Sequence, residues 1–177
     1  MNIIVAVDKN WTIGCKGKLL YQIPLDMSFF KTTTTGKVIV VGRKTLESFP
    51  NKAPLPNRLN IILSKALTNE KKITPENAAK SLVVNSIPEL FKALKNYPKD
   101  DIYIVGGEMI YRQLLPYTNL AYVTKINAVT KCQNNLNYFE NLDNNKDWEL
   151  IEESPNHITN NIEICFCKYK NLNVKPF

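Results

Sequence analysis

The chain has 177 residues, of which 44% are hydrophobic, so it has the composition of a globular protein and a length that usually forms one domain. No apolar run is long enough to span a membrane, and the N-terminal segment lacks the pattern of a signal peptide. We therefore expect residues 1–177 to form a single cytoplasmic domain with no membrane partner.

The chain is basic, with 23 Lys and Arg against 16 Asp and Glu and a formal net charge of +7. A polyanionic ligand, either a nucleic acid or a phosphorylated cofactor, would favour this balance. The alternative is a general richness in Lys and Asn, and the basic residues are indeed scattered along the chain. Because nucleic-acid-binding proteins normally cluster their positive charge, we expect no nucleic-acid partner.

The cysteines and the single histidine do not form a recognisable metal-binding pattern. Cys15, Cys132, Cys165 and Cys167 contain no C-x-x-C pair, and His157 lies in a polar stretch. A zinc site needs three or four suitably spaced ligands, so we expect no metal. Cys165 and Cys167 alternate within an apolar run and are interpreted as small core residues in a reducing compartment.

Taken in chain order, short β-rich segments alternate with helical ones, which predicts an α/β fold. Strands are expected at residues 3–7, 37–41, 59–63, 82–84, 102–105, 120–126, 148–152 and 162–169. The last two are expected to close the sheet as antiparallel strands. Helices are expected from Pro24 to about Thr34, after a capping box at residues 86–89, and over residues 108–115, while residues 68–80 show no clear pattern.

Candidate ligand sites follow several of these strands. Gly42 directly follows one apolar strand, and Gly106 and Gly107 follow another. The segment from Gly42 to Thr45 adds two cations, and Ser64 and Lys65 stand at the end of a third strand. Because ligands of open α/β sheets bind at the carboxyl ends of strands, three such turns favour an elongated phosphorylated ligand. Each turn alone could equally be an ordinary surface turn, and the G-x-G-x-x-G pattern of dinucleotide-binding folds is absent.

Asp26 is the candidate for acid–base chemistry. It lies in the first turn of the expected helix, four residues before Phe30 and therefore on the same helix face. A first-turn carboxylate can simply complement the helix dipole. In an apolar pocket, however, it would hold its proton more tightly and could bind a flat, amidine-like heterocycle through two hydrogen bonds.

Together these residues resemble the dihydrofolate reductase family over nearly the whole chain. The likeness is carried by the ordered set Ile13-Gly14, Pro24-Leu25-Asp26 with Phe30-Lys31, Val41-Gly42-Arg43-Lys44-Thr45, Pro54-Leu55-Pro56-Asn57-Arg58, Asn60-Ile61-Ile62-Leu63-Ser64 and Val105-Gly106-Gly107 with Ile110-Tyr111. It implies a three-layer fold, in which a mostly parallel eight-stranded sheet with an antiparallel C-terminal strand is flanked by about four helices.

The resemblance also implies roles for individual residues. Asp26 would be the catalytic acid, and Arg58 would bind the glutamate carboxylate of the substrate. The substrate site would consist of Val5, Ala6, Asp26, Phe30, Phe49, Leu55, Arg58, Val105 and Thr124. The cofactor NADPH would be held by Ala6, Ile13, Gly14, Gly42, Arg43, Lys44, Thr45, Leu63, Ser64, Lys65, Val105, Gly106, Gly107, Glu108, Met109, Ile110 and Tyr111, with a cis peptide at Gly106-Gly107.

Some positions depart from the family pattern. The lid, residues 15–21, contains Leu20-Tyr21 where the family commonly has tryptophan at the second position. Residues 132–139 lack the aspartate usually found there, which would alter the contact that latches the lid. Glu108 stands where a third glycine is frequent.

The implied activity is NADPH-dependent reduction of dihydrofolate to tetrahydrofolate by a monomer that also binds antifolate inhibitors. Two alternatives stay open: a reductase of the same fold in riboflavin synthesis, and a non-catalytic nucleotide-binding protein. The first would not need Asp26, Phe30 and Arg58 together. The second would need exposed aromatic residues among its cations, whereas most aromatic residues here fall on apolar faces.

Overall fold

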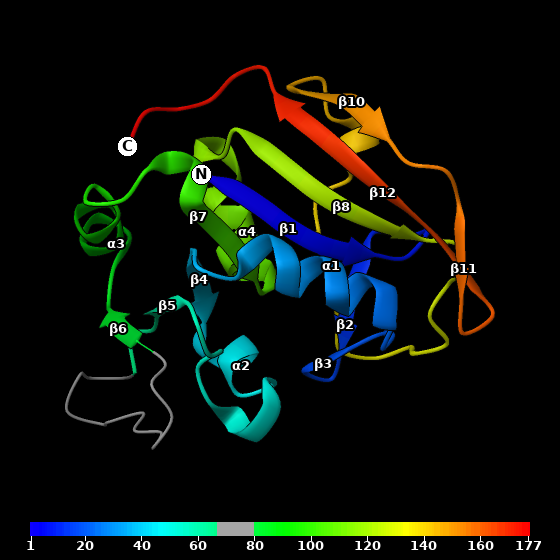
Figure 1. The fold of residues 1–177 in the computed structure, drawn as a ribbon, viewed down its shortest axis with the longest axis horizontal. Helices are drawn as coiled ribbons and strands as arrows, with labels where there is room; N and C mark the ends of the chain where they lie inside the picture. The colour runs from blue at the N-terminus through cyan, green and yellow to red at the C-terminus, as the bar shows by residue number, and fades with distance from the viewer. Residues whose placement is uncertain (67–79) are drawn as a thin grey trace.

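A mixed sheet forms the centre of the computed structural model, which describes residues 1–66 and 80–177 (Figure 1). Eight strands run in the order β10 (Trp148–Glu153), β12 (Ile162–Asn171), β8 (Leu120–Ile126), β1 (Asn2–Val7), β7 (Ile102–Gly106), β4 (Val38–Gly42), β5 (Leu59–Leu63) and β6 (Lys80–Val84). The strands from β8 to β6 are parallel, whereas β12 is antiparallel to both β8 and β10. The predicted sheet is thereby confirmed; the short β11 (His157–Thr159) also pairs with β12.

Four α-helices of the described chain flank this sheet: α1 (Pro24–Thr34), α2 (Arg43–Leu46), α3 (Ile87–Leu94) and α4 (Glu108–Leu114). Short 3-10 turns follow at Pro50–Lys52, Lys99–Asp101, Leu115–Tyr117 and Leu142–Asn144 (η1 to η4). Ser86 caps α3 by accepting a hydrogen bond from the Glu89 amide, as predicted, while the Glu89 carboxylate accepts from the Asn85 amide. No helix in the described ranges is long and apolar enough to cross a membrane.

A second, three-stranded sheet was not expected. It pairs β2 (Thr12–Cys15) with β3 (Lys18–Leu19) on one side and with β9 (Leu136–Tyr138) on the other. The predicted lid therefore contains a small β-hairpin rather than a plain loop. These strands are two to four residues long and rich in polar residues, so no hydrophobic period marks them in the sequence.

The core lies in two layers because β-strand side chains alternate between faces. In β1, Ile3, Val5 and Val7 pack into the cluster that holds the apolar residues of α3 and α4. Ile4 faces the other way, into the cluster that contains Leu46 of α2 and the partly buried Phe29 and Phe30 of α1. Thus α1 and α2 cover one face of the sheet and α3 and α4 cover the other (Figure 1).

Tyr111 of α4 joins the helix layer to the sheet, because its hydroxyl donates a 2.8 Å hydrogen bond to the Ile4 carbonyl. Tyr111→Phe would leave that buried acceptor without its side-chain donor, so we expect a loss of about 1–3 kcal/mol in the free energy of unfolding, measured by urea denaturation. Tyr97, which is 39% exposed, supplies the control. Equal losses in Tyr111→Phe and Tyr97→Phe would contradict this role.

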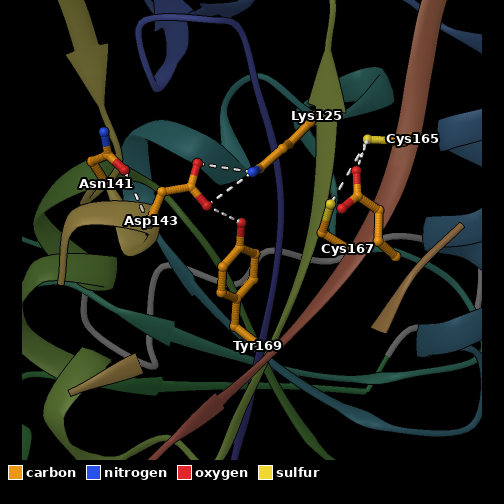
Figure 2. A network of polar contacts seen from close by, with 7 residues as sticks. Lys125, Asn141, Asp143, Cys165, Cys167 and Tyr169 are labelled. Carbon is orange, nitrogen blue, oxygen red and sulfur yellow. Dashed lines mark hydrogen bonds and ion pairs between the residues drawn. The ribbon is translucent and has the colours of Figure 1, made fainter. Parts of the chain in front are cut away.

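On the α3/α4 face, a polar network joins η4 to the sheet (Figure 2). Lys125 of β8 donates to both carboxylate oxygens of Asp143, at 2.9 and 2.8 Å, and Tyr169 of β12 donates to the same carboxylate. Burial raises the pKa of Asp143, but the hydrogen bonds from Lys125 and Tyr169 together outweigh it, so the pKa lies below its usual value. The network therefore favours the ionised form of Asp143 on the α3/α4 face of the sheet.

Cys165 and Cys167 lie beside this network, and the structure confirms that both are buried. Their sulfur atoms are 3.8 Å apart, and with a carboxylate oxygen of Glu153 they form a group within 4.8 Å. That spacing would admit a metal ion, but a metal would require the thiols to lose their protons. Burial opposes this: it raises the pKa of Cys165, and it raises the pKa of Cys167 to about 12.

Candidate active site

Asp26 lies half-buried in the first turn of α1, on the face of the sheet that α1 covers. Pro24 at the start of the helix fixes this turn, since its missing N–H costs no hydrogen bond there. Burial raises the pKa of the Asp26 carboxyl, and the nearby hydroxyl of Thr124, although it forms no direct hydrogen bond, offsets part of that rise. The direction of the pKa shift is the one that an apolar setting would give.

Thr124 is placed beside this carboxyl by β8, where it pairs with Ala6 of β1 and Phe166 of β12. Its side chain is fully buried, yet within the described chain Oγ1 has no direct hydrogen-bond partner. A buried hydroxyl normally finds a partner. Thr124 therefore offers an unpaired polar atom next to Asp26, suited to a water molecule or a polar ligand.

The apolar wall of the site comes from several elements. Phe30, Phe49, Leu55 and Val105, which are predicted to line the substrate site, all pack in the cluster on the α1/α2 face. Ala6 lies in a small neighbouring cluster with Ile23 and Phe166. The strand alternation sends the Val5 side chain to the opposite face, so the predicted contribution of Val5 to this wall would come from its backbone.

Arg58 carries a charge that no carboxylate in the described ranges neutralises. The residue is only 8% exposed. Its Nε donates to Thr34 Oγ1 at 2.9 Å and its Nη1 donates to the Pro56 carbonyl at 2.8 Å, both of which are neutral acceptors. Burial lowers the pKa of the guanidinium. An anionic ligand would therefore gain a strong, well-oriented partner here.

Asp26 and Arg58 lie toward opposite ends of α1. Asp26, Phe30 and Thr34 are spaced by four residues along one helix face, and Arg58 hydrogen-bonds Thr34 and lies over the Phe30 ring, 5.9 Å from its centroid. Eight residues of helix rise correspond to about 12 Å. The arrangement suits an elongated ligand with a flat polar ring at one end and a carboxylate at the other.

The C-terminal ends of β4, β5 and β7, at Gly42, Leu63 and Gly106, lie side by side, as predicted. We call these three strand ends the glycine-ended row. Gly42 of β4 pairs with Leu63 of β5, and the neighbouring Val41 pairs with Gly106 of β7. The Gly106-Gly107 peptide is cis, which confirms the expectation from the resemblance. A side chain would not fit at this turn: a Cβ on Gly107 would come within 2.9 Å of Thr45 Oγ1, and Gly106 has a φ of +110°.

The residues that follow this turn differ in what they can reach. Ile110 and Tyr111 are buried and pack against Gly42 and Gly106 from within the core, so they support the turn rather than line it. Any contact of these two residues with the cofactor would therefore be made by their backbone, and their assignment to the cofactor site stays a prediction. Met109, by contrast, is 61% exposed.

The predicted phosphate-binding side chains gather around the same row. Lys44 and Lys65 are exposed, and neither forms an ion pair with a described residue. Arg43 forms an exposed ion pair with Glu47, and Ser64 Oγ accepts a hydrogen bond from the Ala66 amide at 3.2 Å. Within the described part of the chain, the row thus combines two cations that lack an ion-pair partner with hydroxyl groups.

The three-stranded sheet brings a residue that sequence reasoning missed to the same region. Asn137 of β9 pairs with Gly14 of β2 and donates a 2.8 Å hydrogen bond to the carboxylate of Glu108 at the start of α4. It therefore connects the strand of Ile13 and Gly14 with the glycine turn. No local pattern links residues 29 positions apart, so only the fold reveals this contact.

Comparison with known proteins decides the family. The family model for dihydrofolate reductase matches residues 1–171. A dihydrofolate reductase from Enterococcus faecium is 42% identical over 123 residues, 70% of this chain and 69% of that protein. One from Schistosoma mansoni is 35% identical over 167 residues (86% and 82%), and one from Bacillus subtilis is 29% identical over 175 residues (98% and 95%). The chain belongs to the dihydrofolate reductase family.

The dihydrofolate reductase family implies a nicotinamide cofactor, and the residues present fit one. A pyrophosphate needs close approach to the backbone and nearby positive charge. The glycine-ended row supplies both, because Gly42 and Gly106-Gly107 carry no side chains and Lys44 and Lys65 are exposed beside them. The departure at Glu108 does not block this turn, since its carboxylate is bound to Asn137.

Proposed function

We propose that this protein reduces dihydrofolate to tetrahydrofolate with NADPH as the hydride donor. The observation that carries the proposal is that one face of the sheet holds both a half-buried carboxyl whose pKa is raised and a buried guanidinium that has no carboxylate partner among the described residues. Dihydrofolate matches both ends, because its pteridine ring has an amidine-like edge and its glutamate tail carries carboxylates. The partly buried Phe30, Phe49 and Leu55, which pack on this face, would contact the apolar middle of the substrate.

When bound, the cofactor supplies the hydride, and the protein supplies alignment and a proton. Asp26 would bind the ring nitrogen and the amino group of the pteridine through two hydrogen bonds. Because its pKa is raised, the carboxyl holds its proton to a higher pH than an exposed aspartate does, which suits it to help deliver a proton to the nitrogen next to the carbon that accepts the hydride. Thr124 would orient the carboxyl or an ordered water beside it.

The lid, residues 15–21, would exclude water from the reacting atoms. Its residues 16–19 are exposed in the structure, and Leu19 presents 69% of its surface to solvent. Tyr21 packs with Ile23 and Ile126 at the base of the lid, where burial raises its pKa. Tyr21 thus supplies an aromatic anchor at the position where the family commonly has tryptophan.

The choice of NADPH over NADH would depend on cations that bind the 2′-phosphate. We expect Arg43→Ala to weaken NADPH binding by roughly 10- to 100-fold, because a hydrogen bond to a charged group contributes about 1.5–3 kcal/mol. NADH affinity should change far less, since NADH lacks that phosphate. Fluorescence titration with both nucleotides checks this. Equal weakening of NADPH and NADH binding would show that Arg43 does not bind the 2′-phosphate.

A product assay separates this function from its alternatives. The pure protein is incubated with NADPH and either dihydrofolate or the ribosylated pyrimidine substrate of riboflavin synthesis, and the products are identified by chromatography and mass spectrometry. Tetrahydrofolate from the first mixture, with no reduced product from the second, is the expected result. Reduction of the pyrimidine instead, or nucleotide binding without any reduction, would overturn the proposal.

The same geometry predicts the class of inhibitor. A diamino-substituted heterocycle that protonates more readily than the substrate would form a charged pair with Asp26, and a flat apolar extension would pack beside Phe30. We therefore propose that antifolates of this type compete with dihydrofolate for the Asp26 site.

A further inference from the structure

A covalent link outside the proposed catalytic groups connects two distant parts of the chain. The sulfur atoms of Cys15 and Cys132 are bonded, although 117 positions separate the residues. Their Cα atoms are 6.5 Å apart, within the range of about 4.4–6.8 Å that disulfides span. Cys165 and Cys167, in contrast, are free and buried in the core.

The backbone holds these two cysteines together independently of the bond. Cys15 is the last residue of β2 and pairs with Lys18 of β3 and Leu136 of β9. The next amide, that of Lys16, donates to the Asn135 carbonyl at 3.0 Å. The carbonyl oxygen of Asn134 lies 3.4 Å from each of the two sulfur atoms. The pair is therefore pre-positioned by the small sheet, so that closing the bond requires little rearrangement.

The position of the pair connects it to the lid. Cys15 is the first residue of the lid and follows Gly14, while Cys132 lies in the segment that leads into β9. That segment is itself anchored, because the Thr130 amide donates to the buried carboxylate of Asp8 at 3.0 Å. A bond between Cys15 and Cys132 would consequently attach the movable hairpin to a fixed part of the molecule.

We propose that Cys15 and Cys132 form a redox modification site, at which a small-molecule disulfide such as oxidised glutathione creates a cross-link that fastens the lid hairpin. The expected effect on the release of NADPH rests on the proposed function, whereas the cross-link itself does not. Both cysteines are half-buried and are flanked by the exposed residues Lys16, Lys131 and Gln133, so a reagent of this size can reach them.

The chemistry is a two-step exchange. The thiolate of one cysteine attacks glutathione disulfide, which breaks its S–S bond, forms a mixed disulfide and releases one glutathione. The second cysteine then displaces the other glutathione and forms the Cys15–Cys132 bond. The protein loses two electrons and two protons, and both are recovered in the two molecules of glutathione produced. Reduced thiols reverse the reaction.

Two measurements test the site without reliance on catalysis. Free thiols are counted after denaturation in protein equilibrated with glutathione buffers from reducing to oxidising, and peptide mapping identifies the bonded pair. Hydrogen exchange of the lid amides is followed in both forms. We expect four free thiols in the reduced protein and two in the oxidised protein, with exchange over residues 16–19 roughly tenfold slower after oxidation.

Matched variants separate the cross-link from other effects of oxidation. Cys15→Ser and Cys132→Ser should each abolish the intramolecular bond and the redox dependence of lid exchange, whereas Cys165→Ala should retain both. Oxidised wild-type protein should also release NADPH more slowly than reduced protein. If no Cys15–Cys132 peptide forms in any glutathione buffer, the site is refuted. If the bond forms but lid exchange and NADPH release are unchanged, the fastening role is refuted. If oxidation slows exchange of the lid amides in a protein that does not reduce dihydrofolate, the proposed function is refuted and the cross-link proposal stands.

Discussion

Asp26→Asn is expected to reduce turnover of dihydrofolate by about 10²–10⁴-fold near neutral pH, the usual contribution of a positioned general acid. Asparagine keeps the size and part of the hydrogen bonding of the side chain but cannot donate the proton that the reaction consumes. The affinity for NADPH should be unchanged, because the glycine-ended row that would bind it lies at the ends of β4, β5 and β7, whereas Asp26 lies on α1. Steady-state kinetics and nucleotide titration together check both statements. Unchanged turnover in the variant would remove Asp26 from its role.

The same substitution, although it impairs turnover, is predicted to stabilise the folded protein at neutral pH. Burial raises the pKa of Asp26 in the folded protein, so between the unfolded and the folded pKa the folded state binds more protons than the unfolded state. Stability contributed by this group is therefore present at low pH and declines as the pH rises through that window. Asp26→Asn removes the buried charge and should raise the melting temperature at neutral pH, with less gain in acid. A lower melting temperature at every pH would contradict the account.

Arg58→Leu is expected to weaken dihydrofolate binding by about 2–5 kcal/mol, the cost of removing one partner from a shielded ion pair. NADPH binding should change little. Because Arg58 also hydrogen-bonds Thr34 and the Pro56 carbonyl, the variant loses local support as well as charge. Isothermal titration with each ligand, together with a melting curve, separates these effects.

A truncated ligand gives the sharper control for Arg58. A dihydropterin without the glutamate tail should bind the wild-type protein and Arg58→Leu equally, since it has no carboxylate for the guanidinium. Arg58→Lys should recover part of the dihydrofolate affinity through its charge, but not the bidentate geometry. An equal loss for the tailed and tailless ligands would show that Arg58 acts only by supporting the loop around residues 55–58.

The sequence alone predicted those features of the fold and of the candidate site that depend on one short segment. Continuous apolar strands that end in glycine predicted the row at Gly42 and Gly106, because a strand buried on both faces leaves its end as the place for a ligand. The four-residue spacing of Asp26 and Phe30 predicted their common helix face, and the structure adds Thr34 and Arg58 to that face. In each case a short segment contains the whole signal.

Sequence reasoning failed where distant segments meet. The sheet of β2, β3 and β9, the contact between Asn137 and Glu108, and the Cys15–Cys132 bond each depend on pairing across the fold. The direction of the Val5 side chain, by contrast, could have been predicted locally, since strict alternation along β1 implies that the side chains of Val5 and Ala6 face opposite sides. The segment 68–80, for which no element was predicted, lies almost entirely outside the described residues.

The rate of a single hydride transfer as a function of pH tests the central claim most directly. Protein saturated with NADPH is mixed rapidly with dihydrofolate, and the loss of cofactor absorbance is followed across the pH range for the wild type and Asp26→Asn. We expect the wild-type rate to fall as the pH rises through an apparent pKa above the ordinary aspartate value, and the variant to lack that transition. A wild-type profile that matches the variant at every pH would show that the Asp26 carboxyl does not control the proton.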